Sequence, residues 1–163
     1  MNENNQLYIS IKKFQTTDIQ VAIADFASDW KILTELFKQY LQRQLSDTQL
    51  IWMAYIDDHL AKNLTLKWHS RYKSFAIDNI LEIVDLNLLL PFHQIGIGLL
   101  LLATTEQQAS AKSDIVGISV ILCGGCSLAH RLYTKRGYIL DRKGGIYNIN
   151  TEYQEMIIFL VTS

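Results

Sequence analysis

Hydrophobic residues recur along this chain with two different periods, which separate predicted strands from predicted helices. Residues 7–11 (Leu-Tyr-Ile-Ser-Ile) alternate in period two, as expected for a strand. Leu33, Phe37 and Leu41 recur every four residues and predict an amphipathic helix from Trp30 to about Arg43. The complete set of predictions is strands at residues 7–11, 50–56, 60–68, 80–89, 115–122, 138–140 and 155–161, and helices at 17–26, 30–43, 97–111 and 127–136.

The order of these elements predicts the fold class. Residues 50–56 and 60–68 flank Asp57-Asp58 and are expected to form an antiparallel hairpin, whereas the polar, aromatic-rich residues 69–79 are expected to be a loop. Residues 80–89 are almost continuously apolar, which favours a central strand. Strands and helices do not alternate regularly, so a Rossmann fold is disfavoured and a mixed α/β (α+β) protein is expected. No linker or repeat interrupts the sequence, and residues 1–163 are therefore expected to form a single domain.

Composition and charge restrict the class of protein further. The chain has 163 residues, of which 49% are hydrophobic, and its 15 Lys and Arg nearly balance its 16 Asp and Glu. These values exclude a disordered or collagen-like chain, and they disfavour nucleic-acid binding through bulk positive charge. The two cysteines, Cys123 and Cys126, are too few for a disulfide scaffold and favour a reducing compartment.

The sequence also favours a soluble cytoplasmic protein. Residues 1–6 lack the basic and apolar regions of a signal peptide. Residues 86–103 are mostly apolar and almost long enough to span a bilayer, but Pro91 and Gly96 interrupt them. This interruption is typical of a strand, a turn and a helix in series, so no membrane partner is expected.

All eight glycines lie between Gly96 and Gly145, and two of them mark a candidate anion site. Gly96 and Gly98 stand where the predicted strand at 80–89 leads into the predicted helix at 97–111. A spaced glycine pair lets the backbone approach a phosphate, and the unpaired N–H groups of a first helical turn point at the anion. The alternative is an ordinary tight turn, because the segment lacks the third glycine of a dinucleotide-binding fingerprint and the Gly-Lys-Ser/Thr of a P-loop.

Two separated motifs resemble those of the GNAT N-acetyltransferases. The family pattern Arg/Gln-x-x-Gly-x-Gly/Ala falls on residues 93–98 (His-Gln-Ile-Gly-Ile-Gly). A second family motif, Leu-Tyr-x-x-x-Gly-Phe/Tyr at a helix end, resembles Leu132-Tyr133 followed by Gly137-Tyr138. The resemblance implies a mixed, mostly antiparallel central sheet with flanking helices, splayed between the two central strands at 80–89 and 115–122. It also implies transfer of an acetyl group from acetyl-CoA to a primary amine of a small-molecule, peptide or protein acceptor by direct attack.

The resemblance further implies where acetyl-CoA binds. The backbone of residues 94–98 would hold the diphosphate, and the Leu88 amide would face the thioester carbonyl as an oxyanion donor. Two positions depart from the family: His93 replaces arginine or glutamine, and Cys126 replaces an asparagine that contacts the cofactor in many members. A local basic patch that includes Arg131 suits phosphates, although a solvated helix end has the same composition. The expected cofactor contacts are Leu88, Leu89, His93, Gln94, Ile95, Gly96, Ile97, Gly98, Leu99, Cys126, Arg131, Lys135 and Arg136.

Two residues match catalytic positions of the family. Tyr133 would be the general acid that protonates the departing thiolate, although a helix tyrosine can also pack its ring in the core. Glu82 would be the general base, since a carboxylate within an apolar strand needs a partner or a function, with a solvated Glu at a sheet edge as the alternative. The acceptor side is expected to combine an acidic bias, which suits a cationic amine, with aromatic residues, although scattered aromatics are more often core residues. Its residues are Trp68, Tyr72, Phe75 and Asp85.

Several alternatives stay open at the level of sequence. Cys123-Gly-Gly-Cys126 is also typical of a thiol–disulfide redox motif, but the preceding strand order does not suit a thioredoxin fold. With His130 it offers three zinc ligands where a closed site needs four, so no metal is expected. A catalytically silent domain that binds acyl-CoA is another alternative, favoured by the departure at His93. The acceptor is undetermined between polyamine, amino acid, antibiotic amine and protein or peptide amine, and so is the oligomeric state, with a homodimer as one option.

Overall fold

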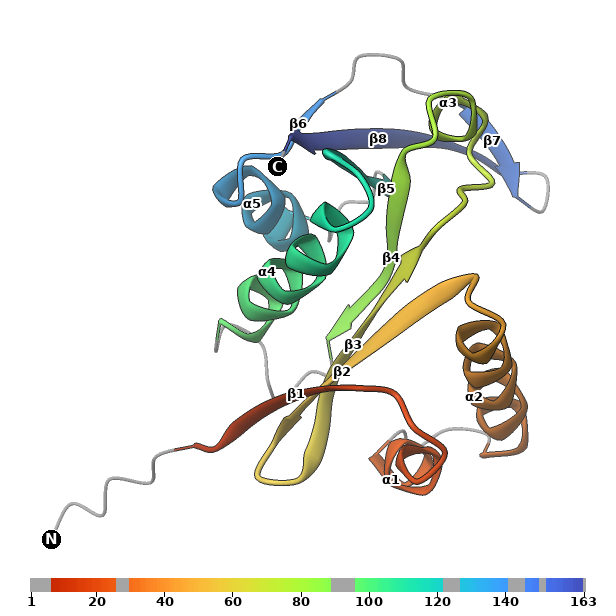
Figure 1. The fold of residues 1–163 in the computed structure, drawn as a ribbon, viewed down its shortest axis with the longest axis vertical. Coiled ribbons are helices and arrows are strands. Elements are labelled where there is room, and N and C mark those ends of the chain that lie inside the picture. The colour runs from red at the N-terminus through yellow and green to blue at the C-terminus, as the bar shows by residue number, and fades with distance from the viewer. Residues whose placement is uncertain are drawn as a thin grey trace, which may run out of the picture. The chain divides into compact units, whose positions relative to one another are not determined.

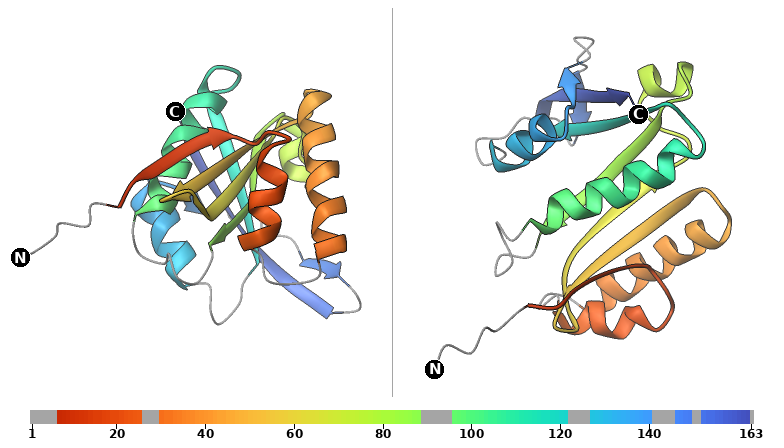
Figure 2. Two further views of the ribbon diagram at one scale, coloured as in Figure 1. Left: turned by 90° about the horizontal axis from the view of Figure 1, so that it is seen from below. Right: turned by 60° about the vertical axis from the view of Figure 1, so that its left-hand side comes forward.

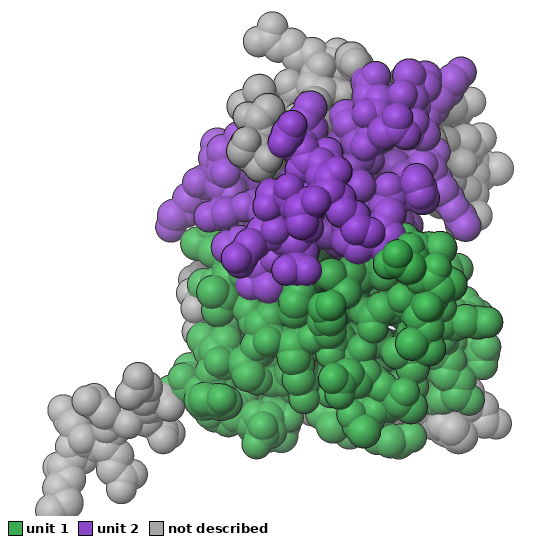
Figure 3. Space-filling model, in the orientation of Figure 1, with its two compact units in different colours: residues 1–65, 85–101 green, residues 66–84, 102–163 purple. Residues whose placement is uncertain are grey.

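The computed structural model describes residues 7–25, 30–88, 96–121, 127–140, 146–149 and 152–162. The chain divides into two compact units, which are described separately (Figure 3). Unit 1 comprises residues 1–65 and 85–101, and unit 2 comprises residues 66–84 and 102–163.

The helices and strands follow one another along the chain as drawn in Figure 1. They are β1 (Ile9–Lys13), α1 (Asp18–Asp25), α2 (Trp30–Leu45), β2 (Gln49–Ile56), β3 (His59–Lys67), α3 (Lys73–Ile77), β4 (Leu81–Leu88), α4 (Ile97–Ser110), β5 (Ile115–Ile121), α5 (Ser127–Lys135), β6 (Ile139–Leu140), β7 (Ile146–Ile149) and β8 (Glu152–Thr162). Every helix and strand predicted from hydrophobic periodicity is confirmed, with ends that shift by a few residues at most.

The strands are ordered β1-β2-β3-β4-β5-β8-β6, with β7 paired to β8. β4 and β5 are parallel, and Glu82 lies opposite Gly117, whereas β1–β2, β5–β8, β6–β8 and β7–β8 are antiparallel. The ladder between β4 and β5 ends at Ile83 and Ile118, although β4 continues to Leu88. The expected mixed, mostly antiparallel sheet with flanking helices is therefore confirmed, and the splay between its two central strands stays a prediction.

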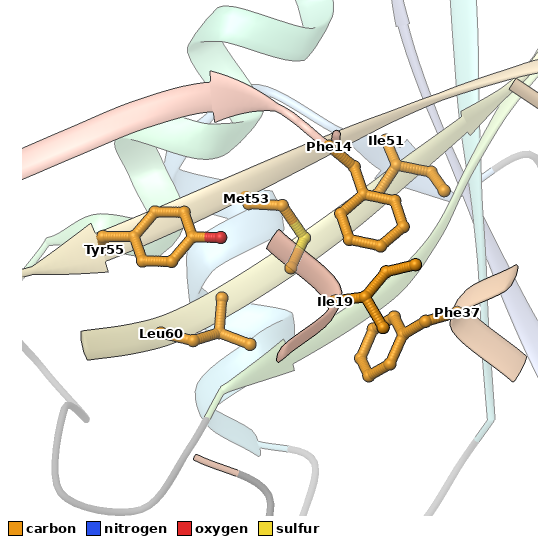
Figure 4. Close-up of a cluster of buried hydrophobic side chains, with 7 residues drawn as sticks. All are labelled: Phe14, Ile19, Phe37, Ile51, Met53, Tyr55 and Leu60. Atoms are coloured by element: carbon orange, nitrogen blue, oxygen red, sulfur yellow. The ribbon is translucent and has the colours of Figure 1, made fainter. Parts of the chain in front are cut away.

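Unit 1 is built on a core between its helices and its first strands. Figure 2 shows α1 and α2 on the same face of β1, β2 and β3. Phe37 of α2 packs its ring 5.6 Å from that of Phe14, and Leu41 packs against the same cluster, as the four-residue spacing predicts. The buried residues of the cluster are Phe14, Ile19, Phe37, Ile51, Met53, Tyr55 and Leu60 (Figure 4).

The hairpin between β2 and β3 closes through a two-residue turn. Asp57 and Asp58 have φ angles of 48° and 67°, the left-handed region that a type I′ turn needs at both central residues. Asp tolerates this region better than most residues do, which explains why the pair Asp57-Asp58 marks the turn.

Two elements of unit 2 were not predicted from the sequence. The expected loop at residues 69–79 contains the short helix α3, and β7 pairs with β8. α3 has five residues and no side-chain hydrogen bond at its N-cap, so neither periodicity nor a capping residue indicates it. The helix is stabilised instead by Phe75, which is fully buried and packs in one cluster with the buried residues Tyr72 and Ile80. β7 has only four residues, too few for a reliable alternation.

Candidate functional site

The first candidate region is the N-terminus of α4, in unit 1. Gly96 is exposed and has φ +80°, and its carbonyl accepts the Leu100 N–H at 3.2 Å. Gly96 is therefore the N-cap of α4, and the N–H groups of the first turn have no partner within the helix. Apart from its chain neighbours and the backbone of the helix, a Cβ at this position would meet no atom of the described residues within 4 Å, so the backbone angle is what favours glycine here. Such a helix start can bind an anion.

The other expected cofactor contacts of this segment are described in part. Ile97 and Gly98 are buried, and Leu99 is half-buried. Leu88 is the last residue of β4, and its backbone alone is described. The positions outside the described residues are Leu89, His93, Gln94, Ile95 and Cys126.

Glu82, the expected general base, lies on β4 in unit 2 with 5% of its surface exposed. Its Oε2 accepts a hydrogen bond of 2.7 Å from the Ser70 hydroxyl, and Ser70 Oγ in turn accepts the Tyr72 N–H at 2.9 Å. The alternative of a solvated Glu at a sheet edge is therefore wrong, because the carboxylate is buried and hydrogen-bonded. Ser70 could not be predicted as a site residue from the sequence, since a single serine in a polar stretch belongs to no recognisable motif.

The aromatic residues expected on the acceptor side are buried to different degrees. Tyr72 packs edge-on against the fully buried Phe75, with ring centroids 5.1 Å apart. The Phe75 ring lies against the backbone of Gly117, where an added Cβ would come within 2.3 Å of Phe75 Cζ. Trp68 is half-buried, and Lys112 Nζ lies 4.0 Å from the centroid of its ring. Unit 2 therefore gathers Tyr72 and Phe75 beside Glu82.

Asp85 completes the expected acceptor side. It lies on β4, three residues beyond Glu82, and its backbone alone is described.

Tyr133, the expected general acid, lies in the last turn of α5 and is 3% exposed. The Tyr138 N–H donates to the Tyr133 carbonyl at 3.1 Å, and the Gly137 N–H donates to the Thr134 carbonyl at 3.0 Å. With Gly137 at φ +90°, these two bonds form a Schellman motif. The motif also brings the Tyr133 and Tyr138 rings together, with centroids 6.0 Å apart. The spacing Tyr133-x-x-x-Gly137-Tyr138 therefore encodes a helix end that fixes the Tyr133 ring.

A carboxylate on α4 binds two side chains at this helix end. Glu106 forms an ion pair with the Arg136 guanidinium and accepts the Tyr138 hydroxyl at 3.0 Å. Arg136 was expected to contribute free positive charge to the basic patch, but its charge is balanced by Glu106. Arg131 and Lys135 of the same expected patch are exposed.

Burial raises the pKa of two hydroxyl groups in this region. It raises the pKa of Tyr133 to about 12 from an ordinary value of 10.0. Burial, together with the neighbouring Glu106 carboxylate, also raises the pKa of Tyr138. The Tyr133 hydroxyl therefore holds its proton at neutral pH and can donate a hydrogen bond there, and the raised pKa makes it a weaker acid than a solvent-exposed tyrosine.

The residues of the alternative metal and redox sites lie only partly within the ranges that the structure describes. Within those ranges, no group of three or more His, Cys, Asp or Glu side chains is arranged to hold a metal ion. Cys123 and Cys126 lie outside the described residues, so the redox motif is not described. In the described part of the chain, no helix is long and apolar enough to cross a membrane.

The chain has similar folds among solved structures but no similar sequence among known families and curated proteins. No protein-family model matches the chain, and no curated protein matches its sequence. Among solved structures, an acetyltransferase of the GNAT family from Streptococcus pneumoniae is 14% identical, with a TM-score of 0.66 over 96% of this chain and 100% of that chain. NAA60 of Arabidopsis thaliana in complex with acetyl-CoA is 18% identical, with a TM-score of 0.69 over 95% of this chain and 98% of that chain.

A third solved structure extends the similarity to a polyamine-modifying enzyme. Mutant forms of the spermidine/spermine N-acetyltransferase SpeG from Vibrio cholerae are 12% identical, with a TM-score of 0.69 over 95% of each chain. Each match covers nearly the full length of both chains, and at these identities the similarity concerns the fold. The chain therefore has the GNAT fold.

Proposed function

We propose that this protein is an acetyl-CoA-dependent N-acetyltransferase that acetylates a primary amine of a small molecule, or of a peptide or protein, by direct attack. The observation that supports this proposal most directly is the backbone conformation at the start of α4. There, a glycine N-cap at φ +80° opens the helix at the position of the family's Arg/Gln-x-x-Gly-x-Gly pattern. NAA60, which shares the fold, binds acetyl-CoA, and this supports the same co-substrate here.

The proposed reaction needs an oxyanion donor, an acid and a base from the chain. The acceptor nitrogen attacks the thioester carbonyl, and the Leu88 amide would stabilise the oxyanion that forms. The C–S bond then breaks, and Tyr133 would give its proton to the departing thiolate. Glu82 would receive the proton that the acceptor ammonium loses before the attack, and the second proton that the nitrogen loses as the amide forms would return to the Tyr133 oxygen. Exposed Arg131 and Lys135 would attract the phosphates of coenzyme A.

Acetyl transfer to a panel of amines tests the proposed activity. The protein is incubated with acetyl-CoA and, in separate reactions, spermidine, lysine, an aminoglycoside and a short peptide with a free N-terminus. We expect at least one amine to release free coenzyme A thiol in proportion to the acetylated product found by mass spectrometry. Binding of coenzyme A without transfer to any amine would favour the catalytically silent domain instead.

The phosphate role of the α4 N-terminus has a separate test. Gly98→Asp should raise the Kd for coenzyme A, measured by isothermal titration, by a factor on the order of ten, because a carboxylate in the first turn opposes the bound phosphates. Gln107→Asp adds the same charge at an exposed position further along α4 and should leave the Kd unchanged. Thermal unfolding shows whether both variants are folded. Equal affinity in folded Gly98→Asp and wild type would overturn this assignment.

A further inference from the structure

The connection between β3 and β4 encloses the proposed base. It comprises residues 68–80 and contains α3. Ser70, Tyr72 and Phe75 in this connection are 8%, 9% and 0% exposed. The Phe75 ring lies against Gly117, which is the partner of Glu82 in the parallel ladder of β4 and β5. A proton from an acceptor amine must therefore reach a carboxylate that the surrounding side chains largely cover.

Ser70 has the hydrogen-bonding capacity to transmit that proton. A serine hydroxyl offers one hydrogen to donate and two lone pairs that accept. The hydrogen is donated to Glu82 Oε2 at 2.7 Å, and one lone pair accepts the Tyr72 N–H at 2.9 Å. Within the described residues no other donor reaches Ser70 Oγ, so one lone pair is left for an incoming ammonium group. The bond from Tyr72 also fixes the serine, as in turns closed by a Ser hydroxyl.

We propose that Ser70 relays the acceptor's proton to Glu82, an inference that rests on the proposed acetyl transfer. The acceptor ammonium donates a hydrogen bond to the free lone pair of Ser70 Oγ. As that proton moves onto Oγ, the hydrogen that Ser70 held passes to Glu82 Oε2. One N–H bond breaks, one O–H bond forms on the carboxylate, and Ser70 ends as a neutral hydroxyl. The acceptor is left as a free amine with a lone pair that can attack the thioester.

Substitution of Ser70 gives a pattern that a purely structural role would not produce. We expect Ser70→Ala to lower kcat/KM about 10²-fold at pH 7, measured with the panel amine that the wild-type chain acetylates fastest, without changing the Kd for coenzyme A. The loss should shrink as the pH approaches the pKa of the acceptor amine, because a neutral amine needs no relay. Ser70→Thr, which keeps a hydroxyl, should retain most of the activity. In a Glu82→Gln background, Ser70→Ala should add little, since both changes interrupt one path.

A matched control and a second variant make the test decisive. Ser74→Ala changes a half-buried serine of the same connection and should keep the wild-type activity and pH profile. If thermal unfolding shows that Ser70→Ala is unfolded, Ser70→Cys replaces it, with a weaker donor in nearly the same space. An unchanged pH profile in the folded variant, or a loss that adds fully to that of Glu82→Gln, overturns the relay and leaves the proposed function intact. Failure of the wild-type chain to acetylate any amine overturns both.

Discussion

Tyr133 combines a buried ring with a hydroxyl that keeps its proton well above neutral pH. Tyr133→Phe retains the ring contact with Tyr138 and removes only the proposed proton donor. We therefore expect turnover to fall about 10²-fold while the affinity for coenzyme A, measured by titration, stays nearly constant. Tyr8→Phe, at a position that is 68% exposed, is the control for removal of a phenol hydroxyl. Unchanged turnover in Tyr133→Phe would reject the role of acid.

Lys62 on β3 makes the stability of the fold depend on pH. The residue is 5% exposed, and burial lowers the pKa of Lys62 from 10.5 to about 8. Between these two values the unfolded chain holds the lysine proton and the folded chain has released it. The free energy of unfolding therefore rises with pH across this window, and the fold carries the cost of the buried charge at neutral pH.

Removal of this charge should stabilise the fold at neutral pH. We expect Lys62→Met to raise the free energy of unfolding at pH 7 by on the order of 3 kcal/mol, with most of the gain lost by about pH 10. Urea unfolding at both pH values measures the effect. Lys67→Met, at the half-buried end of the same strand, accounts for the added apolar surface. A gain of equal size at both pH values would mean that the charge is not its origin.

At the scale of elements, α3 packs against β5 at Gly117, where β5 has no side chain. An added Cβ at Gly117 would lie 2.3 Å from Phe75 Cζ and 2.4 Å from Cε2, so one of the two elements would have to move. Gly117→Ala should therefore lower the free energy of unfolding by about 1–3 kcal/mol. In combination with Phe75→Leu, the second change should cost less than it does alone. A double-mutant cycle by urea unfolding measures this coupling, and strictly additive costs would contradict the steric contact.

The elements that could be predicted from the sequence are those whose signal lies within one stretch of chain. The spacing of Phe37 and Leu41 predicts α2, and Asp57-Asp58 predicts the hairpin turn, because periodicity and turn chemistry are local. α3 could not be predicted, since its single turn is stabilised by packing of Phe75 on Gly117, a residue far along the chain. Tertiary contacts decide such short elements, and local propensity does not.

The same distinction applies to the candidate site. The motif around Tyr133 and Gly137 predicts a helix end correctly, since a Schellman motif depends on neighbouring residues. The pairing of Arg136 with Glu106 and that of Ser70 with Glu82 join residues of different elements. A count of local charges therefore overstates the free positive charge at the end of α5. Long-range partners of this kind are set by the fold and leave no pattern in one sequence.

At the scale of the whole molecule, the two compact units share elements of the chain. The boundary between them falls within β3 after Thr65, within β4 after Val84 and within α4 after Leu101. Domain boundaries normally fall in exposed linkers, whereas these fall inside hydrogen-bonded elements. A single domain over residues 1–163 accordingly stays our prediction.

A single domain of this size should unfold in one cooperative transition. Urea unfolding followed by far-ultraviolet circular dichroism and by tryptophan fluorescence should give coincident curves, because the strands and the aromatic residues of both units then lose their structure together. Two separated transitions, or curves that do not superimpose, would indicate units that fold independently.

The fit of Phe75 against Gly117 also restricts the order in which this sequence can change during evolution. A side chain at residue 117 costs less stability once residue 75 has become smaller, whereas a smaller residue 75 meets no steric obstacle at residue 117. Related chains that keep an aromatic residue at 75 should therefore keep glycine at 117, and the combination of an aromatic residue with a larger residue at 117 should be the rare one. The connection that contains Ser70 and Phe75 would then be conserved together with Gly117 on β5, although the two segments lie far apart in the sequence.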